Sequence, residues 1–84
     1  MEQYRWDETK SRRLKLTRGM SFEEILNGKV IDIVDHPQRA HQKKLIIVFN
    51  GYCWAVPFVM DKETRFLKTL YPSRQATRHY LKKG

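Results

Sequence analysis

Three basic residues, Arg74, Arg78 and Lys82, recur at every fourth position near the end of the sequence. In a helix this spacing forms one stripe and leaves Ala76 and Tyr80 to pack on another side. Like charges at this spacing repel by about 0.2–0.5 kcal/mol, so an unmixed stripe is tolerated when an anion lies on it. Basic residues near a helix C-terminus also suit the helix dipole without any ligand. The stripe therefore favours a polyanion-binding face only slightly over a solvated helix end.

Lys68, Tyr71 and His79 add a second kind of chemistry to Arg74 in the same segment. Lys68 and Tyr71 end a predicted strand, and Arg74 opens the predicted helix, where helix amides also face anions. Metal-free RNA cleavage needs a base for the ribose 2′-hydroxyl, cations around the pentacovalent phosphate and an acid for the leaving oxygen. A histidine can serve as base or acid near neutral pH, and Tyr71 could be an acid or stack on a base. A lone histidine in a basic helix is more often simply exposed, so the catalytic interpretation stays open.

A metal site is not expected from this sequence. The flanks of His36, His41 and His79 do not repeat, and the first two lie in a polar segment where such residues are ordinary. Cys53 is the only cysteine, which excludes an intrachain disulfide and a four-cysteine metal site. Its apolar neighbours make it a small core residue. We therefore expect neither metal nor cofactor.

The 84 residues carry a net charge of +8, with a pI of about 9.9, which favours a polyanionic partner. The charge is uneven: residues 61–84 hold seven Lys or Arg against two acidic residues, a net of +5. The length predicts a single domain over residues 1–84 with a thin core. Because no signal peptide, lipidation motif or membrane-spanning run is visible, we expect a cytoplasmic protein that does not bind a membrane.

The elements that must position these residues begin with two helices. Asp7 is a plausible N-cap for a polar helix that runs to about Arg18 and stops at Gly19. Ser21 and Glu24 form a capping box, which predicts a second helix of one to two turns. We expect Met20 before the cap to pack on Ile25, and residues 4–6 to form a short strand or an extended arm.

The rest of the chain predicts strands followed by a helix. Residues 29–36 and 65–71 are predicted strands, separated from a central hairpin by a polar loop over 37–44 and a turn over 61–64. The hairpin, over residues 44–60, turns at Asn50-Gly51, and its run "LIIVF" indicates a strand covered on both faces. Pro57 should face an edge, a bulge or a strand end. The predicted fold is α+β: two N-terminal helices, an antiparallel sheet of three to four strands and a C-terminal helix, with the helices on one face.

Four aromatic residues have basic neighbours: Tyr4, Trp6, Tyr52 and Trp54. Tyr52 and Trp54 alternate with Cys53, so they share one face of a predicted strand. If that face is open, they could stack on bases or on a partner. The more ordinary interpretation is that one side of the hairpin closes the core.

The chain resembles the BrnT family of bacterial toxins in motifs spread over its length. These are the opening "YRWDETK", the helix start "RGMSFEEI" and the late segment "PSRQATRHYL". The motif residues are Trp6, Asp7, Lys10, Gly19, Ser21, Phe22, Glu23, Glu24, Ser73, Arg74, Ala76 and Thr77. The sequence departs from the family where Arg18 replaces a histidine common before the glycine, and where "YPSR" replaces a run around "SAR".

The resemblance implies a RelE-like fold and a metal-independent ribonuclease toxin. It implies a cognate antitoxin that carries a DNA-binding portion, masks the toxin and assembles oligomers with it. We predict a catalytic group of Arg74, Arg78, His79, Tyr71 and Lys68, with Lys10, Arg18 and Lys82 binding RNA. Two alternatives remain: a non-catalytic module that docks nucleic acid or an acidic partner, and a toxin of the same fold that acts on a topoisomerase.

Overall fold

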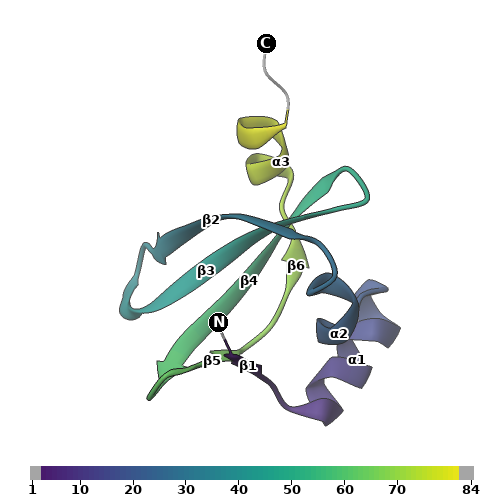
Figure 1. Cartoon of the computed structure of the whole chain (residues 1–84). Helices are drawn as coiled ribbons and strands as arrows, with labels where there is room; N and C mark the ends of the chain where they lie inside the picture. The colour runs from purple at the N-terminus through teal and green to yellow at the C-terminus, as the bar shows by residue number, and fades with distance from the viewer. Residues whose placement is uncertain (1–2, 82–84) are drawn as a thin grey trace.

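The computed structural model describes residues 3–81, which form a six-stranded sheet with helices attached to it (Figure 1). The predicted α+β class and all three helices are confirmed, but the sheet is larger than the three to four strands expected. In chain order the elements are β1 (Gln3–Arg5), α1 (Glu8–Arg18), α2 (Phe22–Ile25), β2 (Lys29–His36), β3 (Arg39–Phe49), β4 (Tyr52–Asp61), β5 (Thr64–Leu67), β6 (Tyr71–Pro72) and α3 (Arg74–Tyr80).

The first two helices begin where their N-caps predict, and α1 also ends where Gly19 predicts. The Asp7 carboxylate caps α1 by accepting from the Thr9 amide, and Gly19 ends the helix in the left-handed conformation at φ 76°. Such a φ is easily adopted only by glycine. Ser21 and Glu24 close the predicted capping box around α2.

A buried hydrogen-bond network joins α1 to α2. The Ser11 side chain is 1% exposed; its oxygen accepts from the Phe22 amide at 3.0 Å and donates to the Glu23 carboxylate at 2.6 Å. The bond from Ser11 is the main reason that the pKa of Glu23 lies below its usual value, because it stabilises the ionised carboxylate. The short α2 is thus fixed to α1 by polar contacts as well as by packing.

The sheet has the strand order β1-β5-β4-β3-β2, with β6 also paired to β4. The chain enters it through β1, which pairs in parallel with β5, while the other pairs are antiparallel. Residues 4–6 were predicted as a strand or an arm, and the structure has the strand at Gln3–Arg5. At the predicted hairpin turn, Asn50 and Gly51 have φ of 52° and 76°, the positive values that a two-residue type I′ turn requires.

The predicted polar loop over residues 37–44 is wrong in length. Only Pro37 and Gln38 separate β2 from β3, because His36 already pairs with Arg39. The first five residues of β3 are exposed apart from the buried Gln42, so they do not show the apolar alternation that marks a strand. Backbone pairing holds this part in the sheet instead: Arg39 pairs with His36 of β2, and from Gln42 onward β3 also pairs with β4.

The predicted strand over residues 65–71 is divided into β5 and β6. The Lys68 amide donates to the Pro57 carbonyl at 2.8 Å in the gap between them. The backbone nitrogen and carbonyl oxygen of one strand residue point to the same side. The nitrogen of Pro57, which carries no hydrogen, therefore faces this gap, where no strand needs it as a donor. A continuous strand would place Leu67 and Leu70 on opposite faces. Because the strand is interrupted, both side chains enter the same core.

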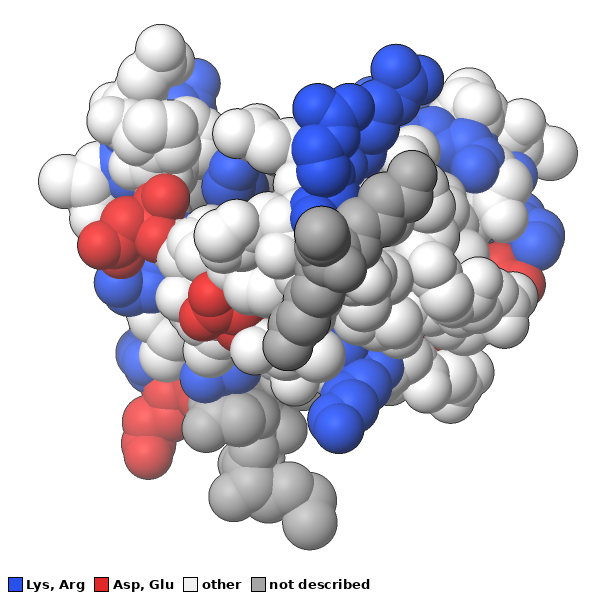
Figure 2. All heavy atoms as spheres, turned by 90° about the horizontal axis from the view of Figure 1, so that it is seen from above, with Lys and Arg blue, Asp and Glu red and all other residues white. Residues whose placement is uncertain are grey.

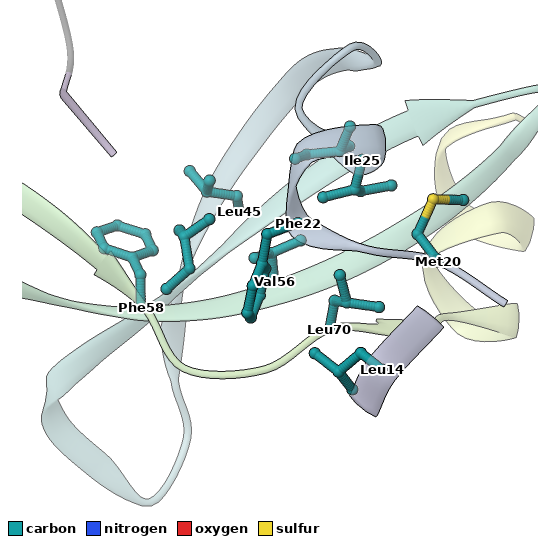
Figure 3. Close-up of a cluster of buried hydrophobic side chains, with 10 residues drawn as sticks. Leu14, Met20, Phe22, Ile25, Leu45, Val56, Phe58 and Leu70 are labelled. Carbon is teal, nitrogen blue, oxygen red and sulfur yellow. The ribbon is translucent and has the colours of Figure 1, made fainter. Parts of the chain in front are cut away.

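Helices cover both faces of the sheet, so the prediction that they lie on one face is wrong. One face packs against α1 and α2 through a large apolar core (Figure 3). Its buried members are Leu14, Met20, Phe22, Ile25, Leu45, Ile47, Val56, Phe58, Leu67 and Leu70. The other face meets α3 over a smaller cluster of buried Ile46, Cys53, Ala55 and Ala76. β3 therefore buries side chains on both faces, as the run "LIIVF" predicted.

Candidate functional site

The N-terminal half of α3 is anchored to the start of β4. Ser73 caps the helix by accepting from the Ala76 amide, and its own amide donates to the Cys53 carbonyl at 2.9 Å. The Thr77 hydroxyl accepts from the buried Cys53 amide at 2.9 Å and donates to the Ser73 carbonyl at 2.8 Å. Because both backbone groups of Cys53 bond to this segment, the position of α3 along β4 is fixed.

The last turn of α3 is held to the edge strand β2. The Tyr80 hydroxyl donates to the Asp32 carboxylate, and the ring of Tyr80 packs edge-on against His79 at 4.7 Å between centroids. The bond from Tyr80 and a bond from the Ile33 amide lower the pKa of Asp32, because both stabilise its ionised form. The same contact raises the pKa of Tyr80. The helix therefore has an attachment at each end.

One flank of α3 borders a small pocket of about 260 Å³. It is lined by Tyr52, Arg74, Thr77 and Arg78. Both arginine side chains are exposed, whereas Thr77 lies at the buried base of the helix. The structure thus brings together the two arginines that the sequence predicts for the catalytic group, and it adds Tyr52 to them.

The other flank borders a larger groove of about 660 Å³. Apolar residues of the sheet, Val34, Ile46 and Ala55, line it together with Lys44 and residues of α3. The α3 residues are Ser73, Gln75, Ala76, Arg78, His79 and Tyr80. Arg78 is common to both cavities, but Arg74 and His79 lie on different flanks. Five residues of helix separate them by roughly 140° around its axis, at about 3.6 residues per turn.

The other two predicted catalytic residues line neither of these cavities. Tyr71 pairs with Ala55 in the sheet and packs, half-buried, against the smaller core cluster. Lys68 is exposed in the gap between β5 and β6, with its ammonium 5.6 Å from the centre of the Phe66 ring. Neither is brought against the two arginines of the small pocket.

The predicted RNA-binding residues are spread more widely. Lys10 and Arg18 belong to α1, on the face opposite α3, and the Arg18 guanidinium donates to the Leu70 carbonyl at 3.0 Å. This bond places Arg18 beside the chain that leads to β6. Lys82 lies outside the described residues.

Figure 2 views the molecule from above, toward its α3 end. Lys and Arg side chains stand in separate groups across this face, with carboxylates among them on both sides of the view. Within residues 3–81 no cluster of His, Cys, Asp and Glu has the arrangement of a metal site. In the same part of the chain, no helix has the length and apolar character needed to cross a membrane.

Two residues that line the small pocket, Tyr52 and Thr77, were not among the predicted site residues. Thr77 could have been found, because Ser73 and Thr77 lie four residues apart and face the same side of the helix. The pairing of Tyr52 with the arginines has no local signal, since it depends on the contact between Cys53 and Thr77 across 24 residues. From the sequence, Tyr52 was predicted only to stack on bases or on a partner if its strand face were open.

No protein-family model matches this chain, and no curated protein matches it. Among solved structures, the chain is similar to the ribonuclease toxin BrnT of Brucella abortus, with a TM-score of 0.59 and 24% sequence identity. The match covers 89% of this chain and 100% of that one. The BrnT-like fold implied by the sequence motifs is thereby confirmed.

Proposed function

We propose that this protein is the toxin of a type II toxin–antitoxin pair and acts as a metal-independent endoribonuclease. One observation carries the proposal: on a fold shared with a ribonuclease toxin, Arg74 and Arg78 line the same small pocket. Two guanidinium groups can together hold a phosphate and neutralise the charge that develops on it during cleavage.

In the proposed reaction, the ribose 2′-hydroxyl loses its proton to a base and attacks the adjacent phosphorus. A bond forms between phosphorus and the 2′-oxygen, and the bond to the 5′-oxygen of the next nucleotide breaks after that oxygen is protonated. The products are a 2′,3′-cyclic phosphate and a 5′-hydroxyl. Arg74 and Arg78 bind the non-bridging oxygens, whose charge is greatest in the pentacovalent transition state.

The geometry supports His79 rather than Tyr71 as the proton-transfer residue. His79 shares a cavity with Arg78, whereas Tyr71 lines neither cavity and packs beneath α3. A substrate that reaches His79 from the small pocket must pass Arg78, which borders both cavities. We assign Lys68, Lys10 and Arg18 to the RNA backbone beyond the cleaved bond, where a positive charge is sufficient.

The antitoxin is proposed as the second partner, with RNA as the substrate in the cytoplasm. The net charge of +8 suits a partner with an acidic surface, and assembly with an antitoxin would govern the oligomeric state. In the proposed pair, the antitoxin covers the basic α3 end and carries the DNA-binding portion.

A binding module without catalytic activity is the second candidate, and one observation favours it: Arg74 and His79 lie on different flanks of α3. Such a module would bind RNA with an affinity that falls steeply with salt and would leave no new RNA termini. RNA binding with intact termini would therefore decide for this candidate.

Inducible expression with growth measurement and RNA-end mapping tests the proposal. Wild type should arrest growth and generate new 5′-hydroxyl termini, and Arg74→Ala should do neither. Gln75→Ala, which changes the neighbouring residue on the other flank, should leave growth arrest in place. Growth arrest with intact RNA and damaged DNA would contradict the proposal and favour a topoisomerase as the target.

A further inference from the structure

The small pocket combines an aromatic ring with two guanidinium groups. Tyr52 comes from the start of β4, while Arg74 and Arg78 come from α3. Tyr52 is half-buried but does not belong to either apolar cluster, unlike Trp54 on the same strand face. Tyr52 therefore borders a cavity instead of joining a core cluster.

The position of Tyr52 is fixed on both sides along the chain. Before it, the Asn50-Gly51 turn sets the pairing of Tyr52 with Phe49. After it, Cys53 donates its amide to Thr77 and accepts the Ser73 amide through its carbonyl. Tyr52 is thus held next to the helix that carries the arginines, which is the preorganisation a binding site needs.

The chemistry of this pocket matches one nucleotide. Guanidinium groups bind phosphate in a bidentate manner, and a tyrosine ring offers a face on which a base stacks. Among residues 3–81 no carboxylate lines the pocket, so none of the described side chains there repels an anion. Its volume of about 260 Å³ is below the range of about 300–1,000 Å³ for pockets that bury a drug-sized ligand. The size suits a single base with its phosphate.

We propose that Tyr52 stacks on the base adjoining the phosphate held by Arg74 and Arg78, so that the three residues form a nucleotide subsite. The inference rests on the proposed ribonuclease function and names the residue that would set its base preference. The Thr77 hydroxyl is already engaged by Cys53 and Ser73, so among the described lining residues only the two arginines and the Tyr52 hydroxyl can read a base edge. The subsite therefore prefers purines through their larger stacking area.

Nucleotide binding by the full chain tests this subsite. Adenosine 5′-monophosphate should bind more tightly than ribose 5-phosphate, which has no base. Tyr52→Ala should weaken adenosine monophosphate binding by roughly 5- to 100-fold, the effect of losing one stacking contact, and should leave ribose 5-phosphate binding unchanged. That unchanged binding shows that the two arginines keep their places.

Two further variants keep the test decisive. Tyr52→Phe should bind adenosine monophosphate like wild type, because the ring face remains. Tyr52→Leu keeps an apolar side chain of similar bulk, so it protects the fold but should lose affinity as the alanine variant does. Equal binding by all four proteins would overturn the inference, as would a phenylalanine variant as weak as the alanine one, since the hydroxyl would then be the active group.

RNA cleavage measured in parallel separates this inference from the proposed function. If wild type leaves RNA intact but binds adenosine monophosphate in a Tyr52-dependent way, the subsite stands and the ribonuclease proposal fails. If RNA is cleaved and Tyr52→Ala alters neither cleavage nor nucleotide binding, the ribonuclease proposal stands and the subsite is refuted.

Discussion

The two faces of the sheet differ in how they are covered. Toward α1 and α2, a cluster of ten buried apolar residues fills the space between helices and strands, whereas toward α3 the buried cluster has four members. Both cavities described above lie beside α3. Since stabilisation grows with apolar area removed from water, the α1–α2 face supplies most of the free energy of folding.

This difference indicates that the α1–α2 face serves mainly stability, whereas the surroundings of α3 serve ligand binding. The surroundings of α3 keep basic side chains accessible, and specific hydrogen bonds at both ends of the helix compensate for its weak packing. Substitutions on the α1–α2 face should therefore change stability, and those beside α3 should change ligand binding and activity.

Two adjacent isoleucines of β3 give the sharpest test of the division. Ile47 is fully buried in the α1–α2 core, while Ile46 points to the other face and borders the larger groove. Such truncations cost about 2–5 kcal/mol, depending on how far the surroundings close over the cavity. In urea unfolding, we expect Ile47→Ala to lower the free energy of unfolding by an amount near the upper end of this range. Ile46→Ala should lower it by an amount near the lower end. Equal losses would show that both faces contribute alike.

Ser11→Ala should cost about 1–3 kcal/mol, because it leaves the buried Phe22 amide without its hydrogen-bond acceptor. Urea or thermal unfolding measures the loss. Glu23→Gln is the matched control: its side-chain oxygen can still accept from Ser11, so a much smaller change is expected. If the two variants lose the same stability, the carboxylate of Glu23 is the important group instead of the Phe22 amide.

Thr77→Val removes the hydroxyl that joins α3 to β4 while keeping the shape of the side chain. The Cys53 amide loses its partner, so we expect a cost of about 1 kcal/mol and a shift of α3. RNA cleavage or binding should fall by more than the stability loss explains, because Arg74 and Arg78 lose their fixed position. An activity equal to wild type at a temperature where both proteins are folded would contradict this role.

Acid should weaken the protein modestly. The pKa values of Glu23, Glu24 and Asp32 are lowered in the folded state, chiefly by bonds from Ser11, Lys15 and Tyr80 respectively. The unfolded chain therefore binds these protons first, and stability present above the ordinary glutamate value of 4.5 is lost as the pH falls through the lowered values. The urea midpoint of unfolding should therefore decrease as the pH is lowered below 4.5. In Ser11→Ala the midpoint should depend less on pH.

The parts of the fold predicted best are those with local chemistry. Asp7 and the Ser21–Glu24 pair fix helix starts, and Asn50-Gly51 fixes a turn, because each acts within a few residues of chain. The start of β3 at Arg39 and the break between β5 and β6 depend on pairing with distant strands, so no local pattern marks them. The placement of helices on both faces likewise follows from tertiary packing.

The candidate site was predicted in part for the same reason. Helical spacing correctly placed Arg74 and Arg78 together, and the same spacing separates His79 from Arg74. The approach of Tyr52 depends on a contact between β4 and α3, which the sequence does not reveal. The catalytic and RNA-binding assignments stay predictions until variants are measured.

The most direct test of the division between the faces is the RNA cleavage rate of a purified Arg74→Ala/Arg78→Ala double variant, measured beside its urea unfolding curve. We predict that cleavage falls by at least roughly 100-fold, as when a transition-state donor is removed, while the unfolding midpoint stays near that of wild type. Cleavage at the wild-type rate by the folded double variant would contradict the account.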